Sequence, residues 1–200
     1  MDIQRFGLKF FARPGFDLDE AIFIDIFQEW IRRRALGGIL LDVADYRHVP
    51  NGPGLMLITH EINFALDQAE GRFGLLAQRK LGQTEGHPAR ILELARATAA
   101  FGALLEADPR LGGKLRLEAG GFHYIANDRL LAPNDEAGFT AVRQALAAAA
   151  TALYPGQTVS LDRVANHPRD RLTVAVESGA ALDFAELATA VGAVARAVQC

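Results

Sequence analysis

Hydrophobic and polar positions alternate with a period of two at several places along the chain, a pattern that predicts strands. The first such segment covers residues 5–11, where apolar side chains alternate with Gly7 and Lys9. Phe11 adds an apolar side chain to the second face as well. We therefore expect a largely buried strand near the N-terminus.

A period of three to four residues follows and predicts the first helix. Apolar side chains within residues 23–31 recur as one stripe of a helix surface, which favours a place in the core over a cofactor site. Asp17 and Glu20 have the spacing of a capping box at the helix start. Gly37-Gly38 is typical of a helix end, and Arg32 to Arg34 would complement the helix dipole there.

The next segments predict the centre of a sheet. Residues 39–44, ILLDVA, are the most apolar strand candidate, and we expect a central strand that is buried on both faces. Residues 47–54 contain two prolines and two glycines, which forbid regular structure. Apolar residues resume at 55–58, and residues 62–67 alternate as in a half-solvated strand.

The rest of the chain repeats the order strand, turn, strand, loop, helix. The three units that share this order are residues 61–107, 113–153 and 157–199. The first unit has a long helix with Pro88 in its first turn. In the second unit we expect a strand around residues 114–118 and a helix capped by Asn134. In the third, Asp183 and Glu186 have capping-box spacing.

These elements predict an α+β fold. Hairpins with one polar face require an antiparallel sheet, and helices then cover the other face. We therefore expect an antiparallel sheet built from repeated strand-strand-helix units with the helices on one face. No internal segment has the composition of a linker, so the sequence predicts one domain over residues 1–200, with possible pseudo-halves at 1–109 and 110–200.

Composition and charge narrow the function classes. Half of the residues are hydrophobic, which suffices for a sizeable core, and the net charge of −3 offers no global field for nucleic acid. The N-terminus has no apolar signal segment, and no apolar run reaches the ~18 residues of a membrane span. We expect a cytoplasmic protein without nucleic-acid or membrane partners. The single cysteine, Cys200, leaves no internal disulfide or multi-cysteine zinc site.

Polar groups concentrate around the predicted central strand. Asp42 interrupts the apolar run, where a carboxylate needs a partner or an aqueous cleft. The next polar groups follow the strand directly, at the end where many α/β proteins bind ligands. We therefore predict a ligand-binding site made by Asp42, Asp45, Tyr46, Arg47, His48, Asn51, His60 and Asn63.

A tight loop at residues 47–54 would bring His48 close to His60. With Asp45 and Glu61 these histidines form what we call the His48–His60 cluster, whose four members are candidate metal ligands. His48, His60 and Glu61 are also candidate catalytic acids and bases. The spacing matches no recognised metal motif.

A structural interpretation of the same residues competes with the functional one. Asp42 and Arg47 would form an ion pair, and Asp45 would stabilise the turn through its side chain. Both histidines would then be polar residues at strand ends. The sequence leaves these alternatives open.

Segments outside residues 42–63 contain fewer candidate functional residues. No phosphate-binding loop, HExxH motif or GxSxG elbow is present. Asn127 and Asp128, in a loop after a predicted hairpin, are weaker ligand candidates. His123 is expected in a packed strand, and His87 and His167 in polar loops that solvent reaches.

Three segments, IQRFGLKFFARPGFDLD, DYRHVPNGPG and NDRLLAPN, are similar to those of an uncharacterised bacterial protein family with no established activity. The similarity extends over most of the chain. It implies a bacterial protein and carries over no cofactor or catalytic residue, so the cofactor is unknown from the sequence.

Two classes of function follow. The favoured one is a non-catalytic cytosolic module that binds a small ligand or a protein partner as a homodimer, because no catalytic motif is assembled and strand edges need pairing or covering. The dimer would form through an edge strand or the alanine-rich helix faces at 141–152 and 188–197. The alternative is an enzyme that uses the His48–His60 cluster on a small polar substrate, with Arg47 as an anion anchor.

Overall fold

The computed structural model describes residues 3–15, 19–36, 39–50, 52–82 and 84–198. Its strands are β1 (Phe6–Phe11), β2 (Leu40–Tyr46), β3 (Gly54–Thr59), β4 (Ile62–Asp67), β5 (Gly74–Arg79), β6 (Gly121–Ala126), β7 (Ser160–Arg163) and β8 (Thr173–Glu177). Its helices are α1 (Ile22–Arg33), α2 (His87–Glu106), α3 (Glu136–Leu153) and α4 (Phe184–Val198). Two short 3-10 turns, η1 (Ala69–Gly71) and η2 (Pro109–Leu111), complete the described elements.

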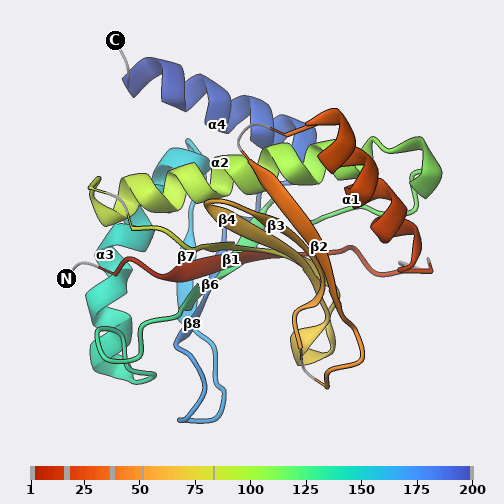
Figure 1. Ribbon diagram of the computed structural model, residues 1–200. Helices are drawn as coiled ribbons and strands as arrows, with labels where there is room; N and C mark the ends of the chain where they lie inside the picture. Colours follow the sequence, from red (N-terminus) through yellow and green to blue (C-terminus); the bar gives the residue numbers. More distant parts are fainter. Residues whose placement is uncertain (1–2, 16–18, 37–38, 51, 83, 199–200) are drawn as a thin grey trace.

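The strands form one antiparallel sheet in the order β2-β3-β4-β5-β1-β6-β8-β7. Every neighbouring pair is antiparallel, and α1, α2 and α4 lie along one side of the sheet (Figure 1). The predicted α+β class is therefore confirmed. Because β1 pairs with both β5 and β6, the sheet runs continuously through the two predicted pseudo-halves.

The two faces of the sheet differ in what covers them. Phe6, Leu8 and Phe10 of β1 join a large core that includes side chains from all four helices. The opposite face carries a smaller apolar cluster of Met56, Ala65, Leu76 and Ile125. The alternation in residues 5–11 thus has its expected meaning, with both faces of β1 buried.

The prediction that residues 39–44 form a central strand is wrong. β2 is an edge strand that pairs only with β3 in the described part of the chain. Leu41 is 53% exposed, and a register irregularity lies between Leu40 and Asp42. An apolar run indicates a strand, but periodicity alone does not distinguish a central position from an edge.

The second unit departs from the predicted order. Residues 114–118 form no regular strand, and Leu117 makes only an isolated bridge with Ala12. The alternating leucines there are buried, which explains the pattern without a strand. The α3 cap is Asp135, which accepts a hydrogen bond from Gly138 N at 2.9 Å, whereas Asn134 donates to Asn166 Oδ1 at 2.6 Å.

The helix ends agree in part with the capping patterns of the sequence. The capping box of Asp183 and Glu186 is confirmed by reciprocal hydrogen bonds of 2.9 and 2.7 Å. α1 ends at Arg33, and Arg34 follows with a left-handed φ of 50°. The predicted start at Asp17 and end at Gly37-Gly38 lie outside the described residues.

His87 is not solvated as predicted. It is buried, and its Nε2 lies 3.0 Å from the Tyr124 hydroxyl. His123, by contrast, points to the opposite face of the sheet, because it is the neighbour of the core residue Tyr124 in β6. In the described helices, no stretch is long and apolar enough to cross a membrane.

A buried ion pair crosses the face of the sheet opposite the large core, which we call the helix-free face. Lys9 Nζ lies 2.5 Å from Asp67 Oδ2, and the two side chains are 2% and 6% exposed. Lys9 also donates to the Ala69 carbonyl at 2.9 Å. Lys9 is on β1 and Asp67 is on β4. Because β5 lies between these two strands, the ion pair crosses β5. Gly74 leaves the space for this crossing, since a Cβ there would stand 3.1 Å from Lys9 Cε and 2.5 Å from Phe10 O.

Lys9→Met is expected to lower the free energy of unfolding by about 3–5 kcal/mol, because it leaves the Asp67 carboxylate buried without its cation. Urea unfolding measures the loss. Lys9→Met/Asp67→Leu, which removes both charges, should recover most of it.

The matched control is Arg33→Met, which breaks an exposed ion pair with Glu29 and should cost under about 1 kcal/mol. A Lys9→Met protein no less stable than Arg33→Met would contradict the importance of the buried pair.

Candidate functional site

The two histidines of the His48–His60 cluster lie at opposite ends of β3. In the β2–β3 pair Tyr46 stands beside Gly54 and Leu40 beside Thr59. His48 therefore follows β2 at one end, and His60 follows β3 at the other. The six residues of β3 separate them by roughly 20 Å at ~3.4 Å per residue. The predicted common site is not formed, and the described residues contain no group of three or more His, Cys, Asp or Glu that could hold a metal ion.

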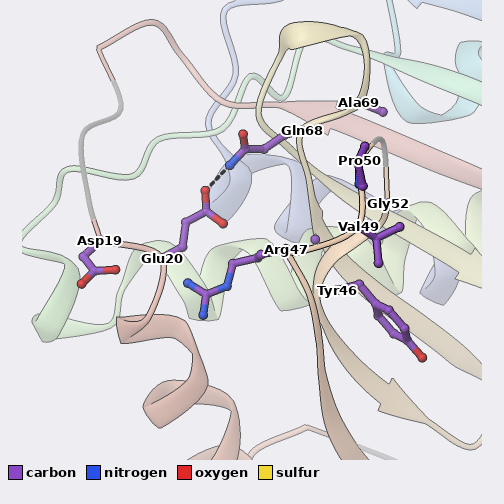
Figure 2. A pocket seen from close by; sticks show the side chains of 10 residues that line it. Asp19, Glu20, Tyr46, Arg47, Val49, Pro50, Gly52, Gln68 and Ala69 are labelled. Carbon is purple, nitrogen blue, oxygen red and sulfur yellow. Dashed lines mark hydrogen bonds between the residues drawn. The ribbon is translucent and has the colours of Figure 1, made fainter.

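The two ends of the β2–β3 hairpin border separate hollows. At the end where Tyr46 pairs with Gly54 lies a cavity of about 570 Å³, which we call the Arg47 cavity (Figure 2). Its lining comes from the segment before α1, the 46–54 loop and the η1 turn: Asp19, Glu20, Tyr46, Arg47, Val49, Pro50, Gly52, Gly54, Gln68 and Ala69. His60 and Glu61 belong to a separate groove at the other end.

Arg47 is held in place by Asp45. Its Nε and Nη2 donate to the two Asp45 carboxylate oxygens at 2.9 and 2.7 Å, and its backbone N–H donates to Asp45 Oδ1 at 3.0 Å. These hydrogen bonds from Arg47 lower the pKa of Asp45 to about 2. The predicted turn-stabilising role of Asp45 is thereby confirmed. The predicted Asp42–Arg47 pair is wrong, since exposed Asp42 accepts from the neighbouring Val43 N.

Glu20 reaches the same cavity from the other side. Its carboxylate accepts a hydrogen bond from the Gln68 side-chain amide, and the Arg47 side chain extends towards Glu20 and Asp19, whereas Tyr46 points away (Figure 2). Burial raises the pKa of Glu20 because it penalises the charged carboxylate, while the positive charge of Arg47 acts in the opposite direction. Glu20 and Arg47 thus present opposite charges to one space.

The wall that carries Gln68 is anchored by the buried ion pair. Asp67 ends β4, and Lys9 holds both the Asp67 carboxylate and the Ala69 carbonyl. Gln68, between these two residues, is fixed at the cavity edge. Gly54 shapes the neighbouring wall, since it has a φ of 67° and a Cβ there would stand 2.1 Å from Leu66 O.

The remaining predicted ligand residues do not come together at one site. His48 is exposed in the loop after β2, and Asn51 lies outside the described residues. Asn63 faces the helix-free side of the sheet between two core residues, and its Oδ1 is buried without a hydrogen-bond partner among the described residues. Of the predicted set, Tyr46 and Arg47 line the Arg47 cavity, with Asp45 behind Arg47.

Sequence reasoning missed Asp19, Glu20 and Gln68 as cavity residues. The spacing of Glu20 from Asp17 and its place just before α1 favour a helix-capping role, which gives no sign of a cavity. Gln68 follows a strand and precedes a glycine turn, a context in which polar residues are ordinary. The pairing of β4 with β3, and of β3 with β2, brings Gln68 to the side of Arg47. Asp19 and Glu20 join the same cavity from the segment before α1.

Comparison of the chain with family models, with curated proteins and with solved structures gives no match. The similarity to a bacterial family stays a prediction.

Gly54→Ala is expected to lower the free energy of unfolding by roughly 2–4 kcal/mol, because it adds a steric clash with Leu66 O to the cost of a positive φ. Urea unfolding is the measurement. Gly15→Ala is the control: Gly15 has a φ of 90° with open space around its Cβ position, so it should lose only about 1 kcal/mol. If Gly54→Ala and Gly15→Ala lost the same free energy of unfolding, the steric clash with Leu66 O would make no contribution, and the prediction would be wrong.

Proposed function

We propose that the protein is a non-catalytic cytoplasmic binding module, and that the Arg47 cavity takes a small zwitterionic compound of amino-acid or short-peptide size. The observation that carries this proposal is the convergence of Glu20 and Arg47, from separate segments, on one cavity of about 570 Å³. Cavities of ~300–1,000 Å³ with a few convergent polar groups are typical of small-molecule sites.

Arg47 supports the recognition of a carboxylate. Asp45 engages its Nε and Nη2, which fixes the plane of the guanidinium and leaves Nη1 outside these bonds. An ordered guanidinium loses less conformational entropy when it binds an anion than a freely rotating one. A ligand carboxylate would therefore accept a charge-assisted hydrogen bond from Arg47.

Glu20 supports the recognition of an ammonium group. Its raised pKa shows that burial opposes the charged carboxylate, and a cation bound beside it would restore the charged form. Asp19 adds a second carboxylate to the lining. Opposite charges at two places in one cavity favour a ligand with both charges over one with either charge alone.

Isothermal titration with free amino acids and dipeptides is expected to identify ligands that lose at least about tenfold in affinity when their amine is acetylated or their carboxylate is amidated. Glu20→Gln should weaken the same ligands about tenfold through the amine, and Arg47→Gln through the carboxylate. Glu85→Gln and Arg169→Gln are the matched controls, because they change exposed charges that do not line this cavity.

The pH dependence of the ligand affinity tests the role of Glu20 separately from that of Arg47. Glu20 must be ionised to bind the ammonium, so affinity should fall as the pH drops through its raised pKa, and Glu20→Gln should remove that fall. The pKa of Asp45, about 2, keeps Arg47 anchored over the same range. Equal binding of blocked and free ligands, or no binding by any of them, would contradict the proposal.

We further propose that β2 pairs with the β2 of a second copy. The outer edge of β2 is unpaired in the described sheet, and Leu41 on it is 53% exposed. The other edge strand, β7, is only four residues long, and a very short edge strand offers little backbone for pairing. Two β2 edges related by a two-fold axis would pair antiparallel.

Light scattering coupled to size exclusion is expected to give about twice the chain mass of 21.6 kDa for the wild type and the chain mass for Leu41→Lys, because a buried lysine opposes edge pairing. Leu130→Lys is the control, since Leu130 is 96% exposed in a loop away from β2. A wild-type protein that stays monomeric, or dissociation by Leu130→Lys alone, would contradict the dimer.

A further inference from the structure

A second hollow, of about 550 Å³, lies where β1 begins, β6 ends and β8 begins. We call it the Arg171 cavity. Its polar lining includes Arg5, Asn127, Asp128, Arg129 and Arg171. It shares no lining residue with the Arg47 cavity, so its occupant does not depend on the ligand proposed above.

Strand pairing places Arg5, Asn127 and Arg171 in one row across the ends of β1, β6 and β8. The Asn127 N–H donates to the Arg5 carbonyl, and the Ala126 N–H donates to the Leu172 carbonyl, both at 2.9 Å. Arg5 and Arg171 therefore lie on either side of Asn127. Neighbouring strands are ~4.8 Å apart, so the backbones of the two arginines are separated by roughly 10 Å. A small ligand between their side chains can contact both.

Neutral groups hold Arg171 in place. Its Nη1 donates to Asn127 Oδ1 at 2.9 Å, and its carbonyl accepts from the Asn166 side-chain amide at 3.1 Å. Asn166 in turn accepts from Asn134 Nδ2 at 2.6 Å. The guanidinium is thus oriented without a carboxylate that would neutralise it, in contrast to Arg47. Because Asn127 accepts with its oxygen, its Nδ2 can donate to a ligand.

The charge of this lining is positive. Within the described ranges, none of its three arginines forms an ion pair. The one carboxylate among the lining residues, that of Asp128, accepts two backbone N–H groups of its own turn at 3.2 and 3.1 Å. Three guanidinium groups less one carboxylate leave a formal charge of +2, although the whole chain carries −3.

We propose that the Arg171 cavity binds the phosphate group of a small phosphomonoester. Such a group carries a charge of about −1.5 to −2 at pH 7 and three acceptor oxygens, which match the charge of the lining and its three guanidinium groups. Arginine donates charge-assisted hydrogen bonds to phosphate oxygens, and Asn127 adds a neutral donor. The volume of about 550 Å³ also accommodates the alcohol part of the ester, since small-molecule sites occupy ~300–1,000 Å³.

Isothermal titration with glucose 6-phosphate tests the proposal. Glucuronate, which carries a carboxylate on the same ring, and uncharged glucose are the comparison ligands. Glucose 6-phosphate is expected to bind at least about tenfold more tightly than glucuronate, and glucose should give no heat of binding. The affinity should fall as the salt concentration rises, because salt screens the attraction between the charges.

Asn127→Asp is the sharpest variant. It keeps the size of the side chain and the oxygen that accepts from Arg171, but it adds a negative charge that repels phosphate, so it should abolish the binding of glucose 6-phosphate. Arg171→Gln should weaken this binding at least about tenfold. Gln144→Glu and Arg32→Gln make the same charge changes at exposed helix positions outside the lining. They are the matched controls and should bind as the wild type does.

Four results would overturn the assignment. Equal affinity for glucose 6-phosphate and glucuronate would show a general attraction for anions. Inorganic phosphate that binds as tightly as glucose 6-phosphate would make the cavity a site for free phosphate. Tighter binding of a short single-stranded oligonucleotide would indicate a nucleic-acid surface. Loss of binding in Arg47→Gln in place of Arg171→Gln would move the phosphate to the other cavity.

A further variant keeps the test decisive if Asn127→Asp fails to fold. Arg5 and Arg129 are exposed, so the double variant Arg5→Gln/Arg129→Gln removes two of the three cations without disturbing the core. It should weaken glucose 6-phosphate at least about tenfold. Unchanged binding in this double variant and in Arg171→Gln would contradict the proposal.

Discussion

The ion pair between Lys9 and Asp67 is the constraint on which the site depends. An ammonium and a carboxylate that are both nearly excluded from solvent are costly to bury unless they meet in good geometry. The pair joins β1, at the centre of the sheet, to the end of β4 across β5. Gly74 must lack a side chain for that crossing to occur. The pair fixes β1 relative to β4, because sliding either strand would separate the charges. β5 must keep Gly74 at the crossing, because a Cβ at that position would stand 3.1 Å from Lys9 Cε.

That same constraint shapes the Arg47 cavity. Lys9 holds the Ala69 carbonyl as well as Asp67, so the turn that carries Gln68 starts from a fixed point. Gln68 then donates to Glu20, and Asp45 fixes Arg47 independently on the edge strand. The two charged groups are thus each placed by a partner behind them. Their positions are set before a ligand arrives, which lowers the entropic cost of binding.

The sequence predicts the fold better than the site, for physical reasons. The alternation around Lys9 and the stripe of residues 23–31 report burial directly, and both elements form. The apolar run of residues 39–44 indicates a strand but not its place at the edge. The two histidines of the His48–His60 cluster are close in sequence but not in space, because the length of β3 separates them. Gln68 reaches Arg47 through pairing across three strands, and Glu20 meets Gln68 from the segment before α1. No local sequence pattern encodes either contact.

The most direct test of the central claim is a backbone amide NMR titration with the tightest-binding amino acid or dipeptide. Chemical shift changes are expected at Glu20, Arg47, Gln68 and Ala69, the residues that line one cavity although they are far apart in the sequence. The same ligand should leave Asn127 and Arg171 unchanged. Shifts that cluster away from the four cavity residues, or that spread evenly over the surface, would contradict the account of a charge-paired site in this cavity.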